Sequence, residues 1–73
     1  MMNEDTIVRE IATQLSLLEA DGTLMEMDSL TVLDFVTEIE RRIGKTVPTI
    51  HIRRSNFESV AAITALLREL KAA

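Results

Sequence analysis

The chain has 73 residues, enough for one domain covering residues 1–73 and too few for two. Apolar residues make up 47% of it and aromatic residues only 3%, so the core must be small and aliphatic, which favours a carrier, adaptor or binding module over an enzyme with a deep catalytic cleft. The net charge of −4 disfavours nucleic acid as a partner, and the absence of Cys excludes disulfides, thiolate metal sites and thiol nucleophiles.

The first predicted helix covers residues 3–20. Apolar residues recur at helical spacing, as in Ile7, Ile11 and Leu15, and Asn3 is the expected N-cap. The sequence DGT that follows is expected to end the helix and to begin a loop that continues to Asp28.

A second helix is expected over residues 29–43. Arg41 and Arg42 followed by Gly44 form a C-terminal stop signal, with cations in the last turn and glycine just beyond it. The next segment, KTVPTIHI, is expected to be a loop because Pro48 disfavours a helix.

The segment RRSN is expected to form one short helical turn, and the last helix is expected over residues 59–70. Ser59 is its expected N-cap, and Ser55 with Glu58 is a competing capping box. No segment shows convincing strand alternation. The pattern therefore predicts an all-α fold with three long helices and one short one.

On a helical wheel, Ser29 lies in the first turn of the second helix, at the edge of an apolar stripe. The stripe consists of Val32, Phe35, Val36, Ile39 and Ile43. The opposite face holds Leu30, Asp34, Thr37, Glu38 and Arg41, with Leu33 on the flank. Leu30 is unusual because it is a large apolar side chain on the polar face.

The sequence Asp28-Ser29-Leu30 is open to two interpretations. In one, Asp28 or Ser29 caps the helix and Leu30 is an ordinary exposed leucine. In the other, the serine hydroxyl is presented for another molecule to modify. The free N–H groups and the dipole of the helix start would favour a negatively charged group attached there.

The sequence MDSLTVLDFVTEIERRIGKTVP resembles the modification segment of acyl and peptidyl carrier proteins, and NFESVAAITALL resembles the start of their last helix. The similarity covers residues 7–70. In that family the serine of D-S-L receives 4′-phosphopantetheine from coenzyme A, so the resemblance assigns covalent attachment to Ser29 and the adjacent acidic position to Asp28. It also implies a small right-handed bundle of three long helices and one short helix. Glu26 stands where the family often has glycine.

The resemblance implies a free-standing, non-catalytic carrier that holds an acyl or aminoacyl cargo as a thioester. Its partners would be a phosphopantetheinyl transferase, a loading ligase or transferase, and downstream biosynthetic enzymes. The initiator Met and the compact length favour a discrete protein. The transferase would supply the activating base and Mg²⁺, because this chain has one His, His51, and no evident nucleophile–base pair or metal site. The nature of the cargo is left open.

The expected partner surface has an acidic and a basic part. Residues 1–28 carry seven acids and one base, whereas residues 45–73 carry two acids and five bases. Many fatty-acid carriers are acidic in the region of Arg53 and Arg54, so this basic pair suggests other partners and a specialised pathway. The expected partner-binding residues are Leu30, Leu33, Asp34, Thr37, Glu38, Arg41, Arg53 and Arg54.

Two other functions compete with the carrier. A small helical adaptor without a prosthetic group would use Leu30 and Leu33 as a docking patch. A helical DNA-binding domain would use residues 53–70, but the last helix carries few cations for phosphate contacts. The N-terminal segment lacks the pattern of a signal peptide and no stretch is long enough to span a membrane, so we expect a cytoplasmic monomer that contacts neither membrane nor nucleic acid.

Overall fold

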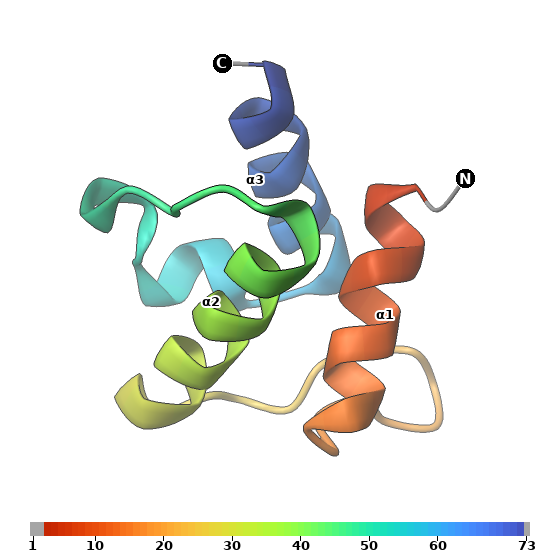
Figure 1. Ribbon diagram of the computed structural model, residues 1–73. Coiled ribbons are helices and arrows are strands. Elements are labelled where there is room, and N and C mark those ends of the chain that lie inside the picture. Colours follow the sequence, from red (N-terminus) through yellow and green to blue (C-terminus); the bar gives the residue numbers. More distant parts are fainter. Residues whose placement is uncertain (1–2, 73) are drawn as a thin grey trace.

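A computed structural model describes residues 3–72 and shows three α-helices joined by two long connections (Figure 1). Along the chain the elements are α1 (Glu4–Gln14), α2 (Ser29–Ile43), the 3-10 helices η1 (Thr49–His51) and η2 (Arg54–Phe57), and α3 (Val60–Ala72). Within the described residues there is no strand, only an isolated bridge between Leu18 and Leu24. The all-α prediction is confirmed.

The core is aliphatic apart from two phenylalanines. Phe35 of α2 and Phe57 of η2 meet edge to face, with ring centroids 6.0 Å apart and an interplanar angle of 69°. Around them pack the apolar faces of the helices, and the side chains without exposed surface include Val8, Ile11, Ile39, Ile63 and Leu67. The apolar stripe predicted for α2 is buried, except that Ile43 is only partly covered.

The first helix is shorter than predicted, because α1 ends at Gln14 and not near residue 20. Ser16 adopts a left-handed backbone with φ 60°, and the Leu17 N–H donates to the Ala12 carbonyl at 2.7 Å. This is a Schellman termination in which serine occupies the position usually held by glycine, and Leu17 and Ala12 are both buried. Leu18 continues the apolar spacing of the sequence beyond the end of α1, but it packs against the core from the loop and not from a helix.

The connection between α1 and α2 folds back on itself. The Glu19 N–H donates to the Thr23 carbonyl at 2.8 Å, and the Met25 N–H donates to the Leu17 carbonyl at 2.8 Å. Gly22, at φ 89°, allows the turn between these bonds. Beyond the turn, Met27 is buried and fixes the chain just before α2 begins.

The bounds of α2 agree with the prediction. Its last turn ends at Gly44, which adopts φ 69° and donates its N–H to the Glu40 carbonyl at 2.9 Å. The Arg42 guanidinium donates to Glu10 at 2.8 Å and to Gln14 at 2.9 Å, which joins this end of α2 to α1.

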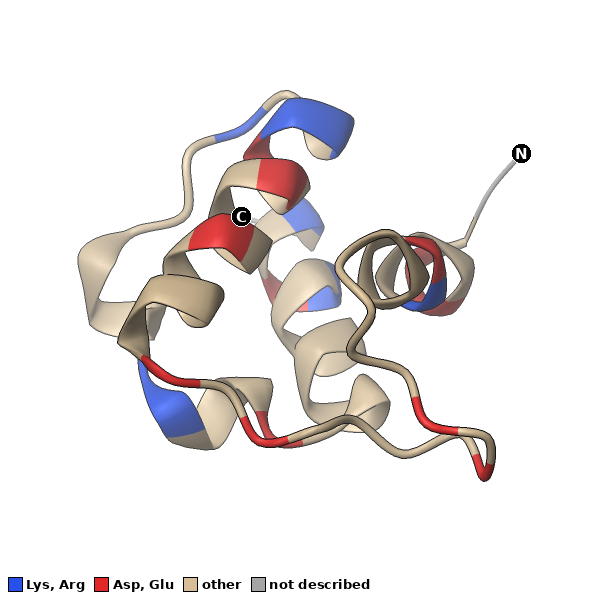
Figure 2. Cartoon of the chain, turned by 90° about the horizontal axis from the view of Figure 1, so that it is seen from below, with Lys and Arg blue, Asp and Glu red and all other residues tan. Residues whose placement is uncertain are grey.

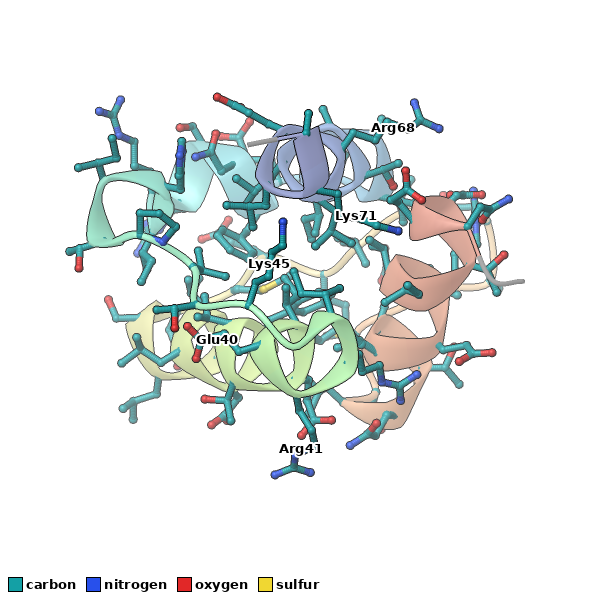
Figure 3. The ribbon with its side chains drawn as sticks, turned by 45° about the horizontal axis from the view of Figure 1, so that its top comes forward. Glu40, Arg41, Lys45, Arg68 and Lys71 are labelled. Carbon is teal, nitrogen blue, oxygen red and sulfur yellow. The ribbon has the colours of Figure 1, made fainter. Side chains whose placement is uncertain are left out.

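Two further bonds hold the chain that leaves α2. The Glu40 carboxylate accepts the N–H of Val47 at 2.7 Å, and the Lys45 ammonium donates to the Leu70 carbonyl near the end of α3 at 3.2 Å. Figure 3 shows Glu40 and Lys45 on the side of α2 that faces α3, whereas Arg41 projects away from the bundle. Val47 is buried, so this part of the predicted loop packs into the core.

The start of α1 and the end of α3 lie near each other. Arg68 and Lys71 each approach the Glu4 carboxylate at 3.6 Å, and Figure 3 places both basic side chains beside the start of α1. The N-terminal end of α2 lies at the opposite side of the molecule (Figure 1). No helix within residues 3–72 combines the length and the apolar character needed to cross a bilayer.

Two details differ from the prediction: α3 ends at Ala72 and not at residue 70, and the connection before α3 contains one more short helix. The short turn expected at RRSN is present as η2, but a second short helix, η1, occupies part of the predicted loop. The Ser59 hydroxyl accepts the N–H of Ala62 at 3.0 Å, so Ser59 and not Ser55 caps α3, as predicted.

Candidate functional site

The start of α2 resolves which residue caps the helix. Asp28 has an extended backbone with φ −82° and ψ 177°, and its carboxylate accepts the N–H of Thr31 at 2.8 Å. Ser29 is the first residue of the helix, is exposed, and has no side-chain hydrogen bond to the described residues. Because Asp28 performs the capping, the hydroxyl of Ser29 is left without a structural role.

The environment of Asp28 keeps its carboxyl group ionised. The N–H and the hydroxyl of Thr31 bond to the carboxylate, and the positive charge of Arg54 acts on it, so the pKa of Asp28 is lowered from its ordinary value. A fixed negative charge therefore stands directly before Ser29 at neutral pH, and a cation faces it from another element.

Beside Ser29 lies a small hollow of about 200 Å³. Ser29, Val32 and Leu33 form its α2 side, and Ile52, just after η1, and Arg54, the first residue of η2, form the other. Val32, Leu33 and Ile52 give the hollow an apolar wall, while Ser29 and Arg54 contribute the polar side chains. The hollow is smaller than the ~300–1,000 Å³ typical of small-molecule pockets, so it fits only part of an attached group.

Local contacts place Arg54 at this hollow. Phe57, at the end of η2, packs against Phe35 of α2 and anchors the short helix to the core. The Asn56 side chain donates to the His51 carbonyl at 2.8 Å, which ties η2 back to η1. In Figure 2 the basic segment at the start of η2 lies beside the N-terminal end of α2.

The apolar residues of the predicted partner surface are strongly exposed. Leu30 keeps 74% of its surface open to solvent and Leu33 keeps 50%. Leu30 immediately follows Ser29, and Leu33 lies one turn further along and borders the hollow. The structure thus brings both leucines to the same end of α2 as the serine.

The polar residues of that surface differ in their availability. Asp34 is exposed and its side chain has no hydrogen bond to the described residues, whereas the Thr37 hydroxyl donates to the Leu33 carbonyl at 2.9 Å. Glu38 pairs with Arg41 at 3.2 Å, and its side chain is only 12% exposed while that of Arg41 is 70% exposed. Glu38 is therefore less accessible than its place on the polar face suggested.

The two members of the basic pair have different roles. The Arg53 side chain donates to the Ile50 carbonyl at 3.1 Å and closes the η1 turn. Arg54 instead borders the Ser29 hollow and a second hollow of about 300 Å³ that is also lined by residues 24–27, Phe57 and Glu58. Both arginines are exposed, but only Arg54 lines the Ser29 hollow.

Sequence reasoning missed one apolar residue of this region. Ile52 lines the Ser29 hollow, whereas Ile50, on η1, is 70% exposed and does not line it. Both belong to the segment predicted as a plain loop. The presence of two isoleucines in this loop was the available signal, but their spacing does not indicate which of them borders the hollow.

The donor set at Ser29 fits a phosphodiester-linked group and not a metal ion. The serine oxygen is accessible, an arginine stands across the hollow, and the apolar wall suits an aliphatic chain. Within residues 3–72 no three His, Asp or Glu side chains are grouped so that they could hold a metal ion.

Comparisons with models of known protein families, with curated proteins and with solved structures gave no match to this chain.

Proposed function

We propose that the protein is a small carrier that holds its cargo on a 4′-phosphopantetheine arm attached to Ser29. The observation that supports this most directly is the division of labour at the start of α2. Asp28 caps the helix, which leaves the Ser29 hydroxyl exposed and without a partner among the described residues. The proposal includes the carrier-type bundle, with α1, α2 and α3 as its long helices and η2 as its short helix.

The attachment requires little from the protein itself. The Ser29 oxygen attacks the phosphorus of coenzyme A that bears the pantetheine; a new O–P bond forms, and the P–O bond to adenosine 3′,5′-bisphosphate breaks. The hydroxyl proton passes to a base of the transferase, because no His or carboxylate hydrogen-bonds to the Ser29 hydroxyl within the described residues. Once attached, the group supplies a terminal thiol that carries an acyl or aminoacyl cargo as a thioester.

The protein contributes a docking surface for the enzymes that modify, load and unload it. Leu30 and Leu33 give an apolar centre beside Ser29, and Asp34 gives an exposed negative charge on the same face. Arg53 and Arg54 give a positive edge at the start of η2. Such a mixture of signs favours selection among partner enzymes through complementary charge. We propose that this occurs in the cytoplasm and in a specialised biosynthetic pathway.

Intact mass tests the attachment directly. The purified chain is incubated with coenzyme A, Mg²⁺ and a broad-specificity phosphopantetheinyl transferase, and we expect the mass to rise by one phosphopantetheine group. Ser29→Ala should gain no mass, and Ser55→Ala, which changes another exposed serine, should be modified like the parent. A parent protein that gains no mass, or modification of the Ser29→Ala variant, would contradict the proposal.

A helical adaptor without a prosthetic group is the second candidate, because Leu30 and Leu33 form an exposed apolar pair. It differs from the carrier in two measurable respects. An adaptor binds its partner equally well when Ser29 is replaced by Ala, and it gains no mass in the presence of the transferase.

A further inference from the structure

We propose that Arg54 binds the phosphate that joins the arm to Ser29 and so orients the first bonds of the attached arm. This inference rests on the proposed function and extends it from the attachment point to a residue on a different element. Sequence reasoning placed Arg54 on a partner surface together with Arg53, but the two side chains are not equivalent.

Arg54 is the basic side chain that lacks a protein partner within residues 3–72. All eight Lys and Arg residues lie in this range, and five of them pair with carboxylates. Lys45 and Arg53 donate to the backbone carbonyls of Leu70 and Ile50. Arg54 has no such bond and instead lines the hollow that contains Ser29.

The nearby acids do not satisfy its guanidinium. Asp28 is near enough for the charge of Arg54 to lower the pKa of its carboxyl group, but the two side chains are not within ion-pair distance. Glu26 and Glu58 border the neighbouring hollow together with Arg54, again without an ion pair. Within residues 3–72 the guanidinium thus forms no ion pair with any of these three acids, and its donors stay available.

A phosphodiester on Ser29 matches what Arg54 offers. It has two free oxygens that share one negative charge, and a guanidinium can bind two such oxygens with parallel N–H···O bonds. Ser29 and Arg54 line the same hollow of only about 200 Å³, so a group on the serine oxygen that enters this hollow comes near Arg54. Arg54 also offsets the repulsion between the phosphate and the fixed negative charge of Asp28.

The pairing has a consequence for the arm. With its phosphate held by Arg54, the first bonds of the arm lie against the wall formed by Val32, Leu33 and Ile52. Arg54 therefore acts as a positioning residue, because it limits the directions from which the arm leaves Ser29. Arg53 has no comparable effect, since its side chain is bonded to the Ile50 carbonyl.

The test uses NMR spectra of the full chain before and after modification of Ser29. In the parent protein, modification should shift the Nε–H resonance of Arg54 and leave that of Arg53 nearly unchanged. Arg54→Gln should move the ³¹P resonance of the attached phosphodiester, and Arg54→Lys should move it less, because lysine keeps the charge but loses the bidentate geometry. The matched control Arg53→Gln removes a neighbouring charge and should leave the ³¹P resonance in place.

Salt gives an independent check. The ³¹P difference between the parent and Arg54→Gln should shrink as salt is raised to about 1 M, where charges are screened within roughly 3 Å. Identical ³¹P resonances in the parent, Arg54→Gln and Arg53→Gln proteins, each carrying the added mass, would overturn the role of Arg54 and leave the carrier function intact. A parent protein that gains no mass would overturn the carrier function and this inference together.

Discussion

The two ends of α2 are held in different ways. At the C-terminal end, Arg42 bonds to α1 and Glu40 bonds to the backbone of Val47, so polar side chains connect this end to other segments. At the N-terminal end, the Asp28 cap stays within its own turn, and Leu30 and Leu33 are left exposed. The C-terminal end of α2 therefore stabilises the fold, while the N-terminal end leaves its side chains accessible to other molecules.

The largest effect on stability is expected at the C-terminal end. Glu40→Ala removes the acceptor of the Val47 N–H, which lies in a partly buried region, and an unsatisfied buried donor costs about 1–3 kcal/mol. Urea unfolding should show this loss as a lower midpoint with an unchanged slope. Asp34→Ala, at an exposed acid in the same helix, is the control and should stay within about 0.5 kcal/mol of the parent. Equal losses in both variants would remove the difference between the ends.

At the N-terminal end the expected effect is on function. Leu30 is 74% exposed, so Leu30→Ala should leave the thermal unfolding midpoint nearly unchanged. It should lower kcat/KM of the phosphopantetheinyl transferase about tenfold, because losing about 1.4 kcal/mol of contact with an enzyme corresponds to that factor. Ile50→Ala is the control, because Ile50 on η1 is exposed to a similar extent, and this variant should keep the parent rate. A stability loss in Leu30→Ala without a change in rate would place Leu30 in the fold and not in docking.

A smaller effect is expected where α2 meets α1. Arg42→Ala removes bonds to Glu10 and Gln14, and the side chain is 28% exposed, so the expected cost is about 1 kcal/mol. Arg41→Ala breaks only a surface pair with Glu38 within the same helix and should cost at most about 0.5 kcal/mol. Thermal or urea unfolding of the two variants side by side measures the difference. If Arg41→Ala were the more costly change, the joint between α1 and α2 would lie elsewhere.

The smallest effect concerns pH. Asp28 has a folded-state pKa below its ordinary value of 3.8, so its capping contribution is present above that value and is lost as the pH falls through the lowered pKa. Asp28→Ala should therefore unfold at a lower temperature than the parent at neutral pH, and the gap should close in acid well below pH 3.8. A gap of the same size at low pH would show that the carboxylate charge does not contribute to the cap.

The parts of the fold that follow local rules were predictable from the sequence. Asn3 caps α1 as expected, with its side chain accepting the N–H of Thr6 at 2.8 Å, and Gly44 ends α2. The end of α1 was missed because Ser16 takes a left-handed conformation that the sequence does not signal, while Leu15 and Leu18 keep the helical spacing. Helix ends that depend on tertiary packing are harder to predict from the sequence than helix ends set by a capping residue.

The candidate site was predictable only in part, for the same reason. The sequence placed Ser29 at a helix start but left open whether Asp28 or Ser29 supplies the cap, and the hydrogen bond to Thr31 settles this. The approach of Arg54 and Ile52 depends on the packing of Phe57 against Phe35, a contact between segments that no local pattern reveals.

The position of Ser29 also affects how the molecule can be handled. The start of α1 and the end of α3 meet through Glu4, Arg68 and Lys71, on the opposite side of the molecule from the start of α2 (Figure 1). A fluorophore, an affinity tag or a surface linker joined near either of those helix ends would leave the Ser29 end unobstructed. Immobilised protein could then be offered to candidate enzymes with the Ser29 end of every copy exposed. A dye at that position would report the tumbling of the whole molecule without contacting the proposed docking surface.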